Sequence, residues 1–398
     1  MSHSAVQKHA PGRTGFALLA LGFRPFFLLA GLAAAASVPL WLLTMQGAVS
    51  VSSHLAPALW HGHEMVFGFG LAVVAGFLLT ATANWTGRRT TAGTGLAALA
   101  VLWLAGRILL SAGETAPAWL AVAVDAAFAP TLALVLLRPI LETRNHRNLI
   151  FPVILLVMGA VNLAFHAAAL GLMPLDPSQI LRAAVDLIVL MIVIIGGRVI
   201  PLFTRNVLPD AGVRSTLPDT PVIAAAALFV VADLVLGSGP VVGVAALAAA
   251  LANGARMIGW RGFAARHMPI LWILHAGYAW VVVAFALRAL AELTGWVPAD
   301  AALHAFTVGA IGTMTLGMMS RVTLGHTGRR IVAAPPTVVA YALVLAAAFL
   351  RVLAPMASGE GYLGLLMFSG MLWTAAFLIF AAVYAPILAR PRADGRPG

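Results

Sequence analysis

Long apolar runs dominate the pattern of hydrophobic and polar positions along this chain. A membrane-spanning helix needs about 20 mostly apolar residues, and twelve runs approach or exceed that length. The expected spans cover residues 16–45, 59–83, 92–112, 117–137, 149–171, 179–200, 220–237, 239–256, 269–291, 301–322, 335–355 and 361–388. Only the stretch from Gly237 to Pro240 marks the boundary between the seventh and eighth spans. The pattern predicts an all-α, polytopic membrane bundle of about 12 transmembrane helices.

The composition leads to the same fold class. Of the 398 residues, 62% are hydrophobic and only 9% are charged, whereas about 25% of the residues in a soluble domain are charged. Such a chain could not cover a water-facing surface, so its main partner is expected to be the lipid bilayer. We expect a single transmembrane domain at 16–388 between cytoplasmic tails at 1–15 and 389–398. The first apolar run lacks a small-residue cleavage site, so it is expected to be retained as a helix.

The charged residues predict the orientation of the spans. The formal net charge is +11, and all basic residues except Lys8 are arginine. Arginines follow the even-numbered spans, as at Arg88, Arg89, Arg138, Arg144, Arg147, Arg198, Arg205, Arg214, Arg256, Arg261, Arg266, Arg329 and Arg330. Acidic residues mark the other loops, as at Glu114, Asp176, Glu292, Asp300 and Glu360. The positive-inside rule then places both termini in the cytoplasm, and this alternation argues against nucleic acid as a partner.

Histidines gather at the predicted outer ends of the spans. His61, His63, His166 and His304 share this depth. The chain has no cysteine, so a metal must be held by histidine, methionine or carboxylate. Imidazole is a common ligand of copper and haem iron. A single buried histidine is usually a hydrogen-bonded structural residue, but four at one depth favour a metal or haem site.

Helical geometry restricts how the ionisable residues near position 61 act together. His61 and His63 point about 200° apart in a regular helix, so they should not bind one metal together. Glu64, three residues after His61, should share its face. Glu64 is either a first-turn acid stabilised by the helix dipole or a residue that supports a ligand and handles protons.

Further candidates lie at both ends of the bundle. Arg107 and Arg182 are either interfacial anchors or partners for haem propionates, and Arg182 could instead pair with Asp186 four residues later. On the inner side, His275 and His326 could form a second metal site. Alternatively, His275 is a hydrogen-bonded bundle residue and His326 a polar loop residue.

Four segments carry a resemblance to a known family. LGFRPFFLLAG (21–31), WHGHEMVFGFGLAVVAGFLLTATANWTGR (60–88), GGRVIPLFTRN (196–206) and HAFTVGAIGTMTLGMMSRVTLGHTGR (304–329) resemble the NnrS family of bacterial inner-membrane proteins. The resemblance implies bound haem and copper, and protection of the cell against nitric oxide and nitrosative stress. It also implies that His61, His63, His304 and His326 are candidate ligands, and His275 matches the family as well. Whether the protein is an enzyme, and which electron donor it would use, stays open.

A second resemblance concerns the architecture. The inner ends of the second, sixth and tenth runs read NWTGR, GGRVIPLFTRN and SRVTLGHTGR, which suggests three pseudo-symmetric four-helix repeats. The main subunit of haem–copper oxidases has twelve helices in such an arrangement, with a haem between histidines of helices 2 and 10. We therefore expect a haem between His61 or His63 and His304, and we expect it to be b-type. The sixth and seventh runs contain no histidine, so the oxygen chemistry of those oxidases is not expected.

Two other functions are compatible with the same pattern. Twelve spans with internal repeats also describe many secondary transporters, and Asp125, Asp186 and Asp233 could then form a proton path. The third possibility is a membrane factor that protects or repairs metal enzymes damaged by nitric oxide, which would need a stable partner.

Overall fold

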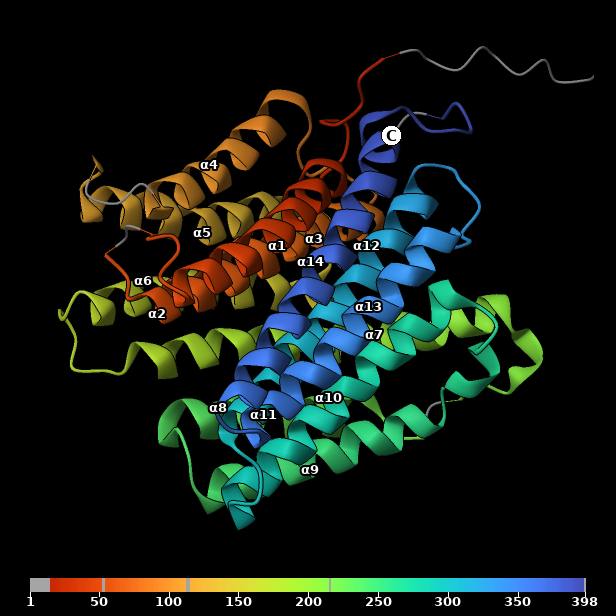
Figure 1. Cartoon of the computed structure of the whole chain (residues 1–398). Coiled ribbons are helices and arrows are strands. Elements are labelled where there is room, and N and C mark those ends of the chain that lie inside the picture. The colour runs from red at the N-terminus through yellow and green to blue at the C-terminus, as the bar shows by residue number, and fades with distance from the viewer. Residues whose placement is uncertain (1–14, 52–53, 112–114, 215, 397–398) are drawn as a thin grey trace, which may run out of the picture.

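The computed structural model describes residues 15–51, 54–111, 115–214 and 216–396, and its helices form the twelve expected spans (Figure 1). No strand occurs within these residues, so the all-α prediction is confirmed. The spans are α1 (Phe23–Met45), α2 to α3 (Pro57–Thr86), α4 (Gly93–Ser111), α5 (Ala118–Glu142), η3 and α6 (His146–Ala169), α7 (Pro177–Val207), α8 (Asp219–Leu236), α9 (Pro240–Ile258), α10 (Pro269–Thr294), α11 to α12 (Ala299–His326), α13 and η7 (Pro335–Met356) and α14 (Glu360–Ala389).

Three spans form the centre of the bundle. The second, sixth and tenth spans are 78%, 67% and 72% buried, and the others are 33–61% buried. We call these three the central spans. The packing of neighbours also recurs every four spans, because α5 packs on α6, α9 packs on α10, and α14 packs on α1 (Figure 1). This arrangement is the one that three four-helix repeats predict.

Arg24 joins the two ends of the chain at the side where α14 ends. Its guanidinium is fully buried and donates hydrogen bonds to the carbonyl oxygens of Leu388 (2.8 Å) and Arg390 (2.7 Å). The amide of Ala17 also donates to the carbonyl of Ala389 (2.8 Å). A guanidinium that satisfies the last carbonyls of a helix stabilises that helix end. The arginine of the LGFRPFF motif therefore links the first span, α1, to the last span, α14.

Some helix ends differ from the predicted boundaries. α1 begins at Phe23 rather than at 16, because residues 17–22 form turns. α7 continues to Val207, so Arg198 and Arg205 lie on a helix and not in a loop. Hydropathy detects only the apolar part of a span, whereas arginine is a good helix former and is favourable near a helix C-terminus. Residues 1–14 of the expected N-terminal tail lie outside the described part of the chain.

Two central spans contain a π-helical segment that the apolar pattern did not reveal. α2 (Pro57–His63) is followed by the π-helix η1 (Glu64–Gly70) and then by α3 (Leu71–Thr86). α11 (Ala299–His304) is likewise followed by the π-helix η6 (Ala305–Gly312) and α12 (Thr313–His326). Each π-helix thus begins directly after a candidate histidine. Such segments are rare and often mark functional sites.

Candidate functional site

The four histidines that share one depth separate into two groups in the structure. His63 lies with His166 and Asp125, whereas His61 lies within electrostatic range of His304. His61 and His63 thus face different neighbours, as their two-residue spacing predicts.

Asp125 is the centre of the first group. Its Oδ2 atom accepts a hydrogen bond from Asn162 Nδ2 (2.6 Å) and lies 3.1 Å from the Nε2 atoms of both His63 and His166. The side chains of Asp125, His63 and His166 are buried, with His63 and His166 at 0% exposure. One ligand atom each of His63, Asp125 and His166 lies within 4.8 Å of the others. We call these residues, with Asn162, Glu64 and Arg107, the His63 cluster.

The charges of the His63 cluster favour a cation. Arg107 donates to Glu64 Oε1 (2.8 Å) and forms an ion pair with Asp125 Oδ1. Two carboxylates and one guanidinium leave one negative charge when the histidines are neutral. Two imidazoles and a carboxylate are ligands that suit copper or zinc. His63, Asp125 and His166 could therefore hold a metal ion.

A second layer of contacts orients the two imidazoles. Glu64 Oε1 lies 3.5 Å from His63 Nδ1, and His54 Nε2 lies 3.2 Å from His166 Nδ1. Partners of this kind fix the ring orientation of metal-binding histidines. Burial and the neighbouring imidazole of His63 lower the pKa of His54, which lies in the loop before α2. His54 is therefore neutral at physiological pH, which suits a ring that contacts another imidazole.

The position of Glu64 corrects one prediction from the sequence. Glu64 was expected to share a face with His61, but its carboxylate contacts His63 and Arg107. The helix changes to π-type hydrogen bonding at Glu64, so α-helical spacing no longer predicts its neighbours. Glu64 is also no first-turn acid, because the helix begins at Pro57.

The second group contains His61, His304 and Arg351. The His61 ring stacks on Trp41 with centroids 5.0 Å apart, and its Nδ1 atom is buried without a hydrogen-bond partner. His304 Nδ1 lies 2.8 Å from the carbonyl oxygen of Asp300, which requires the proton on Nδ1 and makes Nε2 the acceptor nitrogen of the neutral ring. Both His61 and His304 interact electrostatically with Arg351, whose Nη1 atom is buried and unpaired.

A comparison with protein families identifies the chain. The family model described as NnrS protein matches residues 17–392. The chain belongs to the NnrS family. No curated protein matches it.

The second group has the donor set that a haem would require. His61 Nδ1 is buried without a hydrogen-bond partner, His304 adds a second imidazole, and the buried, unpaired Nη1 atom of Arg351 suits a propionate. Arg107 was the expected propionate partner, but both Glu64 and Asp125 engage its guanidinium. The residue types of this group suit the haem that the NnrS resemblance implies, with Arg351 as the cation whose Nη1 atom is free.

Arg182, the other expected propionate partner, belongs to a third polar group. It lies within electrostatic range of Asp186, which hydrogen-bonds Asp233. Arg288 Nη2 donates to Asp233 Oδ1 (2.5 Å) and lies 3.3 Å from Glu292 Oε1. One oxygen of Asp186, Oδ2, is buried without a partner. This Asp186 cluster is a second site of buried charge in the NnrS chain.

The structure gives the two inner histidines different surroundings. His275 Nε2 lies 3.0 Å from Thr204 Oγ1, and its ring lies near Trp260. The His326 ring packs against Phe23, and the backbone carbonyl of His326 accepts a hydrogen bond from Arg392 (2.8 Å). Within the described part of the chain, the rings of His275 and His326 make no contact with each other. A shared metal site of His275 and His326 stays an untested prediction.

Sequence analysis missed the site roles of several residues. Asp125 was expected only as part of a proton path, and Arg351 and Asn162 were given no site role. Asn162 and His166 lie four residues apart on α6, so they share one helix face, and this spacing could have identified Asn162. His54 lies in a loop and carried no such signal.

Proposed function

We propose that this protein is a haem-binding protein of the bacterial inner membrane, with both termini cytoplasmic, that binds nitric oxide and protects the cell against nitrosative stress. The observation that supports this best is that His61, His304 and Arg351, which come from three distant parts of the chain, lie within electrostatic range of one another. Membership of the NnrS family agrees with it.

Each residue of this group has a definite role in the proposal. His61 and His304 would ligate the iron, and Arg351 would hold a propionate. When bound, haem would supply an iron that can bind nitric oxide, which requires that one of the two histidines be held weakly. Stacking on Trp41 orients the His61 ring, and the backbone of Asp300 orients the His304 ring. These contacts orient both rings and use neither Nδ1 of His61 nor Nε2 of His304.

The His63 cluster would hold the second metal, which we propose to be copper. His63, Asp125 and His166 would be its ligands, while Arg107 and Glu64 balance their charge. Because all three ligands are buried, water would be excluded from this ion. Separate groups for haem and copper explain why four histidines occur at one depth.

The test uses purified protein supplied with haem and copper, with His146→Ala as the matched control because His146 is exposed on η3 (His146–Asn148). We expect a Soret band that shifts on addition of nitric oxide, and its loss in His61→Ala and His304→Ala. His63→Ala should keep the Soret band but lose bound copper. Wild-type protein without a Soret band, or a full band in His304→Ala, would contradict the haem assignment.

A secondary transporter is the second candidate function, and the Asp186 cluster supports it. A buried carboxyl group that hydrogen-bonds another and retains a free oxygen could carry a proton. Protein in liposomes should then show pH-driven uptake of a solute that Asp186→Asn abolishes. If haem-free protein in liposomes shows no solute uptake that depends on the pH gradient, this candidate is excluded.

A further inference from the structure

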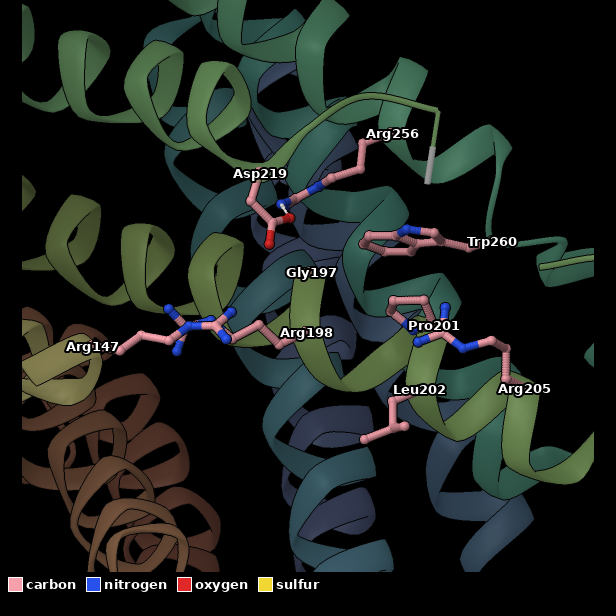
Figure 2. Close-up of a pocket in the computed structure, with 9 residues that line it drawn as sticks. All are labelled: Arg147, Gly197, Arg198, Pro201, Leu202, Arg205, Asp219, Arg256 and Trp260. Carbon is pink, nitrogen blue, oxygen red and sulfur yellow. Dashed lines mark hydrogen bonds and ion pairs between the residues drawn. The ribbon is translucent and has the colours of Figure 1, made fainter. Parts of the chain in front are cut away.

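A cavity of about 370 Å³ lies at the end of the bundle opposite the histidine groups (Figure 2). Arg147 lines it just before α6, and His166 lies near the other end of the same helix. At about 1.5 Å per residue, α6 separates the cavity from the His63 cluster by most of the membrane thickness. The positive-inside rule assigns this end to the cytoplasm.

Positive charge dominates the cavity. Arg147, Arg198, Arg205 and Arg256 line it, together with a single carboxylate, Asp219. Figure 2 shows Arg147 and Arg198 reaching toward one another from different helices, and these two guanidinium groups repel each other electrostatically. The hydrogen bond that Arg198 makes goes to the neutral side chain of Asn148 (3.3 Å). Three positive charges are therefore uncompensated by the residues that line the cavity.

Arg256 is fixed in place at one wall of the cavity. It is 1% exposed, and its Nη2 atom donates to the carbonyl of Val193 (2.9 Å). Its Nη1 atom lies 3.3 Å from Asp219 Oδ1, and its Nε atom is buried without a partner. Gly197 makes this position possible, because a Cβ atom there would collide with the guanidinium. The second glycine of the GGRVIPLFTRN motif thus serves to seat an arginine.

We propose that this cavity is a binding site for a phosphate group. The planar guanidinium matches the geometry of phosphate oxygens, and the volume is within the usual range for small-ligand sites. The positive-inside rule would explain arginines in the loops at this end of the bundle. It does not explain a buried arginine that packs against a glycine. The phosphate comes either from an anionic lipid headgroup or from a soluble phosphate compound, because both present the same chemistry.

The test measures binding to the purified full chain with two probes, inorganic pyrophosphate and cardiolipin. Arg147 and Arg205 are exposed, so the double variant R147Q/R205Q should fold normally, and R198Q extends the series. R138Q is the control, because Arg138 lies at the same end of the bundle, outside the cavity, and is 83% exposed. We expect both cavity variants to lose roughly tenfold or more in affinity and R138Q to bind as the wild type does.

The two probes distinguish the sources of the phosphate. Selective loss of pyrophosphate binding supports a soluble ligand, and selective loss of cardiolipin retained through purification supports a lipid headgroup. If neither probe binds the wild type, or if R138Q weakens binding as much as the cavity variants do, the cavity is no phosphate site.

Discussion

Replacement of Asp125 by asparagine tests whether buried charges hold the outer half of the bundle together. The carboxylate accepts hydrogen bonds from Asn162 and forms an ion pair with Arg107. Asparagine has nearly the same shape but no negative charge. Asp125→Asn therefore leaves Arg107 with Glu64 as its one remaining acidic partner.

The structure sets the expected size of the effect. Asp125 is 4% exposed and the Arg107 side chain 11% exposed, so water cannot replace the lost partner. Breaking a buried ion pair on one side costs about 3–5 kcal/mol. The exposed pair of Arg138 and Glu142 offers a matched control, because their side chains are 83% and 44% exposed, and such a pair contributes about 0.3–0.5 kcal/mol.

The assay is equilibrium unfolding of detergent-solubilised protein by a denaturing detergent, followed by tryptophan fluorescence. We expect Asp125→Asn to lower the free energy of unfolding by about 3–5 kcal/mol and Glu142→Gln by less than about 1 kcal/mol. The double variant R107Q/D125N should lose less than the sum of its single variants, since contacting residues couple by about 0.5–3 kcal/mol. Equal effects of Asp125→Asn and Glu142→Gln would refute the argument from burial.

Two more predictions concern Gly197 on α7 and the ion pair of Arg392 and Asp394 after α14. Gly197→Ala should lower the free energy of unfolding by about 1–3 kcal/mol through overpacking against Arg256. In the control variant Gly364→Ala the new Cβ atom meets open space, so it should raise the free energy of unfolding by up to about 1 kcal/mol. The same unfolding assay measures both variants. Arg392 holds the pKa of Asp394 down to about 2 from its usual 3.8, so their ion pair is complete above pH 3.8 and lost as the pH falls toward 2. Arg392→Gln should return that pKa toward 3.8, measured by carboxyl carbon NMR.

Apolar runs predicted the number of spans because the cost of exposing polar backbone to lipid leaves few alternatives to a helix. They located helix ends poorly wherever the chain enters the polar zone. α7 extends past Arg198 and Pro201 to Val207, since neither the charge nor the loss of one backbone hydrogen bond is costly near water. The π-helices after His63 and His304 also left no mark in hydropathy, because they change hydrogen bonding and not composition.

The site was predicted only as a set of residue types at one depth. Sequence gives the height of His61, His63, His166 and His304 in the membrane but not which helices face each other. The grouping depends on the packing of α5 beside the second span and of α13 beside the tenth, and on the contact of Asn162 of α6 with His63. Asp125 and Arg351 reach the sites from α5 and α13 by that packing alone.

The recurrence of the same packing every four spans explains why one depth holds several unlike sites. In each repeat the central span meets its following helix through polar side chains: Glu64 with Arg107, Asp186 with Asp233, and His304 with Arg351. Repetition of one four-helix unit would place these pairs at equal depth but in three different interfaces. Of the three central spans, only the second and tenth carry histidines there, so the interface of Asp186 and Asp233 retains buried charge without imidazole ligands. Depth in the membrane therefore identifies the candidate ligands. The position of each candidate within its repeat determines which of them can share a metal.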